Sequence, residues 1–141
     1  MVKKDLVTAK LAELAERAAR VRAKCPASSP ALAADPDALD IVSFNLMLAV
    51  QVCADIAAHI TTDERWLPAK SLAEGFTRLE EHGVLQASTA EQLRRAVGLR
   101  NVVAHGYGRV DPTFVFAAAT GGLSDLSDFA REVATWLATQ G

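Results

Sequence analysis

Residues 41–60 read IVSFNLMLAVQVCADIAAHI and form the most apolar stretch of the chain. Only five of these 20 residues are polar, so a helix built from them would be apolar on nearly every side. Such a helix lies at the centre of a bundle or meets a second copy of the chain, and we expect both. Its longest unbroken apolar run is five residues, far short of the roughly 20 that span a bilayer. We therefore expect a central helix and no membrane span.

The segments on the N-terminal side indicate one more helix and a loop. Apolar residues recur at helical spacing from Leu6, and Pro26 disfavours helix at Cys25, which predicts an end there. The proline-containing segment 26–37 is expected to be a loop. Asp35 followed by proline is typical of an N-cap and a first helical residue, so the central helix should run from there to about Thr61.

Helix signals continue after the central stretch. A third helix is predicted over about Pro68–Glu81, with Gly83 as its C-terminal cap. The Ser88–Glu91 stretch, Ser-Thr-Ala-Glu, has the pattern of a capping box and predicts a fourth helix starting there.

Asp111-Pro112 signals the start of the last helical segment, residues 112–139. The β-like run Thr113–Phe116 is interpreted as its first turn, and Gly121-Gly122 leaves open whether this segment is one helix or two. No strand is predicted. The expected fold is all-α, a single domain over 1–141 with about four to five helices.

Charge and cysteine usage limit the possible partners and compartments. The net charge of -2 gives no global attraction to nucleic acid, so RNA binding would depend on a local patch. The many basic residues of the first helix are interpreted as a solvated face. Cys25 and Cys53 are isolated, and the N-terminus lacks an apolar signal core, which favours the cytoplasm.

Polar residues concentrate in GLRNVVAHGYGRVDP, residues 98–112. Asn101 and His105 are i and i+4 on a helix and share a face, whereas Arg100 and His105 are about 140° apart at about 100° per residue. We expect Gly106 to let the helix unwind, so that Arg100 and His105 converge on one cleft with Tyr107 at its lip.

This set of side chains suits phosphodiester cleavage without a metal. The neutral imidazole of His105 can take the proton of an attacking hydroxyl near neutral pH. The Arg100 guanidinium can hold a phosphate oxygen as charge develops, and Asn101 can orient either group. The alternative is structural, because the same residues at a helix C-terminus can cap carbonyls and interact with the helix dipole.

Asp55 and His59 form a second polar pair, at i and i+4 of the central helix. One interpretation is a hydrogen-bonded pair that fixes helix register. The other is that the two residues extend the cleft and support catalysis. The scattered histidines lack metal-ligand spacing, and the glycines do not form a phosphate-binding loop. We therefore predict no metal and no cofactor.

Three segments, in this order, resemble the HEPN-domain toxins of the HepT/MntA toxin–antitoxin type. The stretch NLMLAVQVCADIAAHI looks like the central helix of that family, and EEHGVL looks like the turn that follows. The stretch LRRAVGLRNVVAHGYGRVDP, with its R-x4-H-x-Y motif, resembles the family signature. Two features depart from the pattern: Gly106 stands where the family often has glutamate, and Gly121-Gly122 interrupts the last helical segment.

The resemblance implies an all-α homodimer that acts as a metal-independent endoribonuclease. It makes Arg100 and His105 catalytic at the dimer interface, with Asn101 as a supporting residue. It also implies a partner, a minimal nucleotidyltransferase antitoxin of the MntA type, which transfers AMP to Tyr107 and can join the toxin in a larger assembly. The expected substrate is RNA. The alternative function is a non-catalytic HEPN partner or substrate-binding subunit of a nucleotidyltransferase.

Overall fold

The computed structural model describes residues 1–106 and 110–141. Within these residues all regular structure is helical, which confirms the predicted all-α class. The described elements are α1 (Lys4–Lys24), α2 (Ser29–Ala33), α3 (Pro36–Asp63), α4 (Leu72–Glu81), α5 (Ala87–His105), α6 (Pro112–Thr120) and α7 (Gly122–Ala138). The described part therefore has seven helices, and the predicted number of four to five is wrong.

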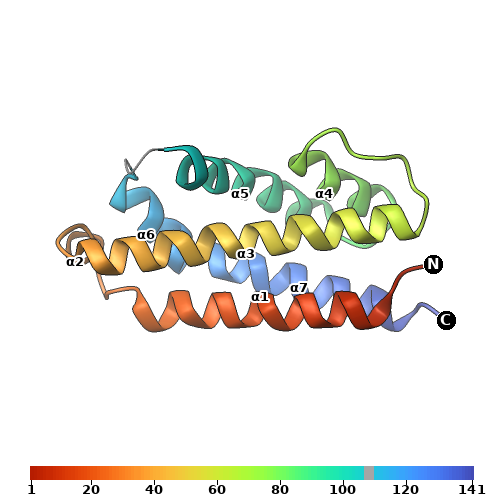
Figure 1. Ribbon diagram of the computed structural model, residues 1–141, viewed down its shortest axis with the longest axis horizontal. Coiled ribbons are helices and arrows are strands. Elements are labelled where there is room, and N and C mark those ends of the chain that lie inside the picture. The colour runs from red at the N-terminus through yellow and green to blue at the C-terminus, as the bar shows by residue number, and fades with distance from the viewer. Residues whose placement is uncertain (107–109) are drawn as a thin grey trace.

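Helix α3 is the axis of the bundle. It packs against α1, α2, α4, α5, α6 and α7, and Figure 1 shows α1 and α5 running along two different sides of it. By length and composition α3 is apolar enough to cross a membrane, but 61% of its most apolar window is buried inside the protein. Its apolar surface is therefore largely the core of the bundle, as expected for a helix that is apolar nearly all round.

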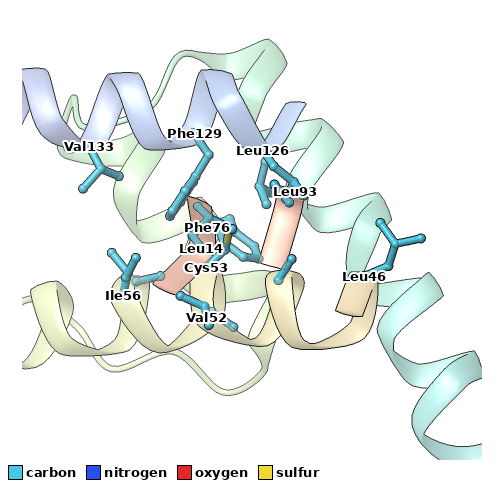
Figure 2. Close-up of a cluster of buried hydrophobic side chains, with 14 of the residues drawn as sticks. Leu14, Leu46, Val52, Cys53, Ile56, Phe76, Leu93, Leu126, Phe129 and Val133 are labelled. Carbon is cyan, nitrogen blue, oxygen red and sulfur yellow. The ribbon is translucent and has the colours of Figure 1, made fainter. Parts of the chain in front are cut away.

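The core forms where α3 meets α1, α4, α5 and α7, and Figure 2 shows side chains that meet there, Leu14 of α1 among them. Phe76 of α4 and Phe129 of α7 are fully buried, and their rings meet edge to face with centroids 5.9 Å apart. Edge-to-face contact is a favoured arrangement of two aromatic rings. Helices α3 and α5 also pack directly against each other, which matters because these two helices carry the candidate site.

The segment 26–37 is not entirely a loop, because it contains the short helix α2. Ser28 is its N-cap and accepts a hydrogen bond from the Ala31 N–H, while Pro30 lies in the first turn. Leu32 is fully buried and anchors the helix to the core. The predicted start of the central helix is confirmed, since Asp35 Oδ1 accepts from the Ala38 N–H.

The last segment is two helices, which decides the alternative that the sequence left open. Asp111 caps α6 by accepting from the Thr113 N–H at 2.9 Å, as predicted. The chain then breaks at Gly121, which is both the C-cap of α6 and the N-cap of α7. The run Thr113–Phe116 lies in the first turns of α6, as expected.

The third predicted helix begins later than expected. Helix α4 starts at Leu72, and Ser71 caps it by accepting from the Glu74 N–H. The segment before it is held instead by Arg78, whose Nε donates to the Leu67 carbonyl at 2.8 Å. Gly83 follows the helix with φ 77°, the left-handed conformation predicted for a C-terminal cap.

The predicted capping box at Ser88–Glu91 is wrong. Helix α5 begins at Ala87, so Ser88 lies inside it, and the N-cap is Gln86. The cap is supplied from α7. Glu132 Oε1 accepts from the Gln86 N–H at 2.7 Å, and Glu132 Oε2 accepts from Thr89 Oγ1 at 2.6 Å. A carboxylate at a helix N-terminus also interacts favourably with the helix dipole, so a distant side chain replaces the local motif.

Candidate functional site

A groove runs between the N-terminal half of α3 and the C-terminal half of α5. In Figure 1 this is the end of the bundle opposite the two chain termini. The groove has a volume of about 440 Å³, and we call it the α3–α5 groove. Its lining is apolar except for two polar side chains, and consists of Phe44, Met47, Leu48, Gln51, Arg100, Val103 and Ala104.

Among the residues that the structure describes, Arg100 is the one charged residue that lines this groove, and two neutral amides hold it. Its Nε donates to Gln51 Oε1 of α3 at 3.0 Å, and its Nη1 donates to Asn101 Oδ1 at 3.0 Å. Within the described residues no carboxylate forms an ion pair with Arg100. Arg94 and Arg95, on the same helix, each pair with a glutamate. Arg100 therefore differs from both, because its described side-chain partners are neutral amides.

Behind Gln51 the polar contacts continue to α1. Gln51 Nε2 donates to Asp55 Oδ1 at 2.9 Å, and Lys10 Nζ lies 3.8 Å from Asp55 Oδ2. The predicted Asp55–His59 hydrogen bond is not formed, because Asp55 takes partners one turn earlier on α3 and on α1. Lys10 therefore belongs to this network and not to a purely solvated face.

Sequence reasoning missed Gln51. Its signal was present in the spacing, because Gln51, Asp55 and His59 are successive i, i+4 positions on one side of α3. The residue that Gln51 contacts, Arg100, lies 49 positions away. Only the packing of α5 against α3 reveals this contact.

His105 does not join Arg100 in the groove. It is the last residue of α5 and is exposed, and no described residue hydrogen-bonds to its side chain. Helix α5 ends at His105 with Gly106 as its C-cap (φ -77°, ψ -2°), so it is regular through His105 and the expected convergence with Arg100 is not seen within one chain. On a regular helix the two side chains project about 140° apart. A single chain thus presents Arg100 and His105 in different directions.

The remaining predicted residues lie apart from this contact network. His59 is half-buried on α3 and forms no hydrogen bond to Asp55. Tyr107, the predicted modification site, lies outside the described residues. Among residues 1–106 and 110–141, no group of three or more His, Cys, Asp or Glu side chains is placed to hold a metal ion. Burial raises the pKa of the Cys53 thiol, so this thiol stays protonated in the core.

Apolar side chains are exposed next to Arg100. Phe44, which lines the α3–α5 groove, is 52% exposed, and Val102 on α5 is 42% exposed. Scattered exposed apolar residues are common. Here, however, Phe44 lines the same groove as Arg100, which is an arrangement suited to contact with another macromolecule.

The fold defines the class of protein, a small all-α bundle, and α5 carries an Arg and a His five positions apart. The family model described as "Ribonuclease HepT-like" matches residues 12–133, which include α3, α5 and the candidate site. The chain therefore belongs to the HepT-like ribonuclease family. This membership confirms the predicted family and, at the level of the family, the predicted enzyme class.

Individual relatives agree with the family match. The chain is 29% identical to the mRNA nuclease HepT of Shewanella oneidensis over 64% of this chain and 68% of that protein. It is 30% identical to the tRNA nuclease HepT of Aphanizomenon flos-aquae, over 67% of this chain and 64% of that protein. The second alignment thus spans just under two thirds of the relative. The two relatives are named for different RNAs, so their names do not define one substrate class.

A solved structure shares the whole arrangement of helices. It is described as the tri-AMPylated HEPN toxin of Shewanella oneidensis in complex with an MNT antitoxin, and it matches with a TM-score of 0.85. The match covers 93% of this chain and 98% of that one, at 24% identity. At this identity the likeness supports the fold.

Proposed function

We propose that the chain is a cytoplasmic toxin that cleaves RNA without a metal, using Arg100 to hold a phosphate and His105 as the general base. The observation that carries the proposal is the Arg100 guanidinium in the α3–α5 groove, fixed by two neutral amides and not neutralised by a described carboxylate. A guanidinium held in this way can bind a phosphodiester through its remaining N–H groups.

The proposed reaction is transesterification within the RNA strand. His105 removes the proton of a ribose 2′-hydroxyl, and the oxygen attacks the adjacent phosphorus. The bond from phosphorus to the 5′-oxygen breaks, and that oxygen takes a proton from solvent. The products are a 2′,3′-cyclic phosphate and a 5′-hydroxyl. Arg100 stabilises the negative charge that develops on the phosphate oxygens.

The site is proposed to need a second copy of the chain. Since α5 is regular through His105, one chain does not direct both side chains into one cleft. Two-fold pairing across the α3–α5 face would bring the Arg100 of one protomer near the partner's His105. It would also cover Phe44, the exposed apolar residue that lines the groove. The homodimer implied by the family resemblance is therefore part of the proposal.

Tyr107 is proposed as the regulatory site. A partner nucleotidyltransferase of the MntA type would transfer AMP from ATP to its hydroxyl, with release of pyrophosphate. The support is its position two residues after His105 and the tri-AMPylated toxin among the structures that share this fold. An added phosphodiester brings negative charge to the edge of a site that must admit RNA, so it should repel the substrate.

The test is RNA cleavage by the full chain, purified without the partner enzyme. Wild type should release fragments with 2′,3′-cyclic phosphate ends, and an RNA carrying 2′-deoxyribose at the cleaved position should stay intact there. Arg100→Ala and His105→Ala should each lower the rate by at least ~100-fold. Intact RNA with wild type under all conditions that keep the chain folded would contradict the proposal.

One observation favours a second candidate, the non-catalytic partner of a nucleotidyltransferase. No described residue orients the exposed His105 imidazole, as a general base usually requires. The two candidates differ in what happens when the chain is expressed alone. A ribonuclease should arrest growth and its His105→Ala variant should not, whereas a binding subunit should be harmless in both forms.

A further inference from the structure

A chain of polar contacts crosses three helices and ends at Arg100. Lys10 of α1 faces Asp55 of α3, which accepts a hydrogen bond from Gln51, and Gln51 in turn accepts one from Arg100 of α5. The last contact, from Arg100 to Asn101, stays within α5. Gln51 is the link between a carboxylate and the guanidinium. Every other arginine of α4, α5 and α7 in the described residues contacts a carboxylate directly.

The two neighbours of Gln51 determine how its amide must be oriented. The Arg100 guanidinium has only donors, so it requires the amide oxygen, and the Asp55 carboxylate has only acceptors, so it requires the amide nitrogen. Both hydrogen bonds, at 3.0 Å and 2.9 Å, are therefore made in the same amide orientation. The Gln51 amide is thus held through both its oxygen and its nitrogen. Its oxygen in turn holds the Nε of Arg100 and so orients the guanidinium plane.

The neutrality of Gln51 is as important as its geometry. Asp55 lies one helical turn from Gln51 on α3 and is hydrogen-bonded to it. A guanidinium that paired with a carboxylate would lose much of its attraction for phosphate, because a bidentate ion pair occupies the same N–H groups. Gln51 occupies the Nε of Arg100 and binds the carboxylate itself, so it separates the two charges by one amide group.

We propose that Gln51 is a positioning residue for the reaction. It orients Arg100 and keeps the guanidinium from being neutralised by a carboxylate, so that Arg100 can bind an RNA phosphate. This inference deepens the proposed ribonuclease function and rests on it. In this role Gln51 and Asp55, on one side of α3, support Arg100. Gln51 itself does not contact the substrate.

The decisive variant moves the carboxylate without changing the total charge. Gln51→Glu/Asp55→Asn keeps both side-chain shapes and the net charge, but it places the carboxylate directly against Arg100. Binding of a single-stranded RNA oligonucleotide is measured at several salt concentrations in a His105→Ala background, where cleavage does not interfere. Gln92→Glu is the control for a carboxylate placed elsewhere on α5, since Gln92 is half-buried and lines a different cavity. Unlike the exchanged pair, it adds one negative charge to the chain.

The exchanged pair should bind RNA at least ~10-fold more weakly than its His105→Ala parent at low salt. The slope of log K against log[salt] should become smaller by about 0.7, the value for one phosphate contact to a single strand. Gln92→Glu should match the parent in slope. If the exchanged pair binds like the parent, the inference is wrong even when wild type cleaves RNA. If the parent does not bind RNA and wild type does not cleave it, the proposed function itself has failed.

A second variant tests orientation apart from charge and does not depend on the first one folding. Gln51→Met has nearly the same shape and no charge, but it is a poor acceptor for Arg100. With His105 present, it should lower kcat by about 10-fold while KM stays within about threefold, because the charge remains and its direction is lost. Unchanged kcat in a variant whose circular dichroism matches wild type would overturn the positioning role.

Discussion

Arg100 and Asn101 are adjacent on α5, and their side chains are joined by a 3.0 Å hydrogen bond from Nη1 to Oδ1. Adjacent residues on a helix usually project away from each other. Here the long Arg100 side chain reaches both Asn101 and, across the groove, Gln51. The guanidinium is thus held at Nε by one helix and at Nη1 by another.

Cleavage should depend on whether the side chain at position 101 is neutral or negatively charged. Asn101→Ala removes one neutral acceptor and should lower kcat/KM by about 3- to 10-fold, as expected for one hydrogen bond worth roughly 1 kcal/mol. Asn101→Asp places a carboxylate against Arg100 and should cost at least ~10-fold more than Asn101→Ala through weaker RNA binding. Equal cleavage rates for the two variants would show that neutralising Arg100 is harmless, against the account.

Glu132 should stabilise the helix that carries the site. Glu132→Ala leaves the Gln86 N–H and the Thr89 hydroxyl without their partner. Loss of a helix cap typically costs about 1–2 kcal/mol in the free energy of unfolding, which urea denaturation can measure. Glu91→Ala is the control, because Glu91 forms only an exposed ion pair with Arg95 on the same helix, worth about 0.5 kcal/mol. Equal losses in the two variants would mean that Glu132 is not the cap.

Asp125 gives a pH dependence of known sign. Burial, and to a lesser extent the Asp128 carboxylate, raise the pKa of Asp125 in the folded chain. The ionised form is therefore less favourable in the folded state than in the unfolded state. The free energy of unfolding accordingly falls as pH rises from the unfolded pKa of Asp125 through its higher folded pKa. Asp125→Asn should stabilise the chain at pH 7.5 and by less at pH 4.5. A stability difference that does not shrink at the lower pH would contradict this assignment.

Tyr107 should be the sole tyrosine to accept AMP, because the chain contains one tyrosine. Incubation with ATP and a partner nucleotidyltransferase should add one or more AMP units by mass spectrometry and abolish RNA cleavage. Tyr107→Phe should gain no mass and should still cleave RNA in the presence of the partner and ATP. AMP found on Tyr107→Phe, or full cleavage by the modified wild type, would remove the proposed regulation.

The sequence predicts the start of a helix when the capping residue is a neighbour in the chain. It does not predict the start of a helix that is capped by a residue distant in the chain. Asp35 and Asp111 cap their helices as expected, because an aspartate next to a proline acts within a few residues. The start of α5 was assigned to Ser88, since nothing near it in the sequence indicates that Glu132 would arrive from α7. Tertiary contacts override local preference at such positions.

The candidate site shows the same limit. The sequence identified Arg100 and Asn101, and the structure joins them. It paired Asp55 with His59 by their spacing, but Asp55 contacts Gln51 and Lys10, the latter 45 positions away on α1. Residues that support a site through another helix leave little trace in the spacing of their own helix.

Arg100 and His105 are proposed to act together across two copies of the chain. The direct measurement is RNA cleavage by a mixture of Arg100→Ala and His105→Ala chains, unfolded together and refolded so that they exchange partners. Each variant alone should be inactive. The mixture should regain about a quarter of wild-type activity, because half the dimers are mixed and each has one complete site of two.

The matched control replaces the His105→Ala chain in the mixture with the double variant Arg100→Ala/His105→Ala. No dimer in this control then contains an intact Arg100. This control mixture should stay inactive. If the first mixture is as inactive as its control while wild type refolded in the same way cleaves RNA, Arg100 and His105 do not act across two chains and the account is contradicted.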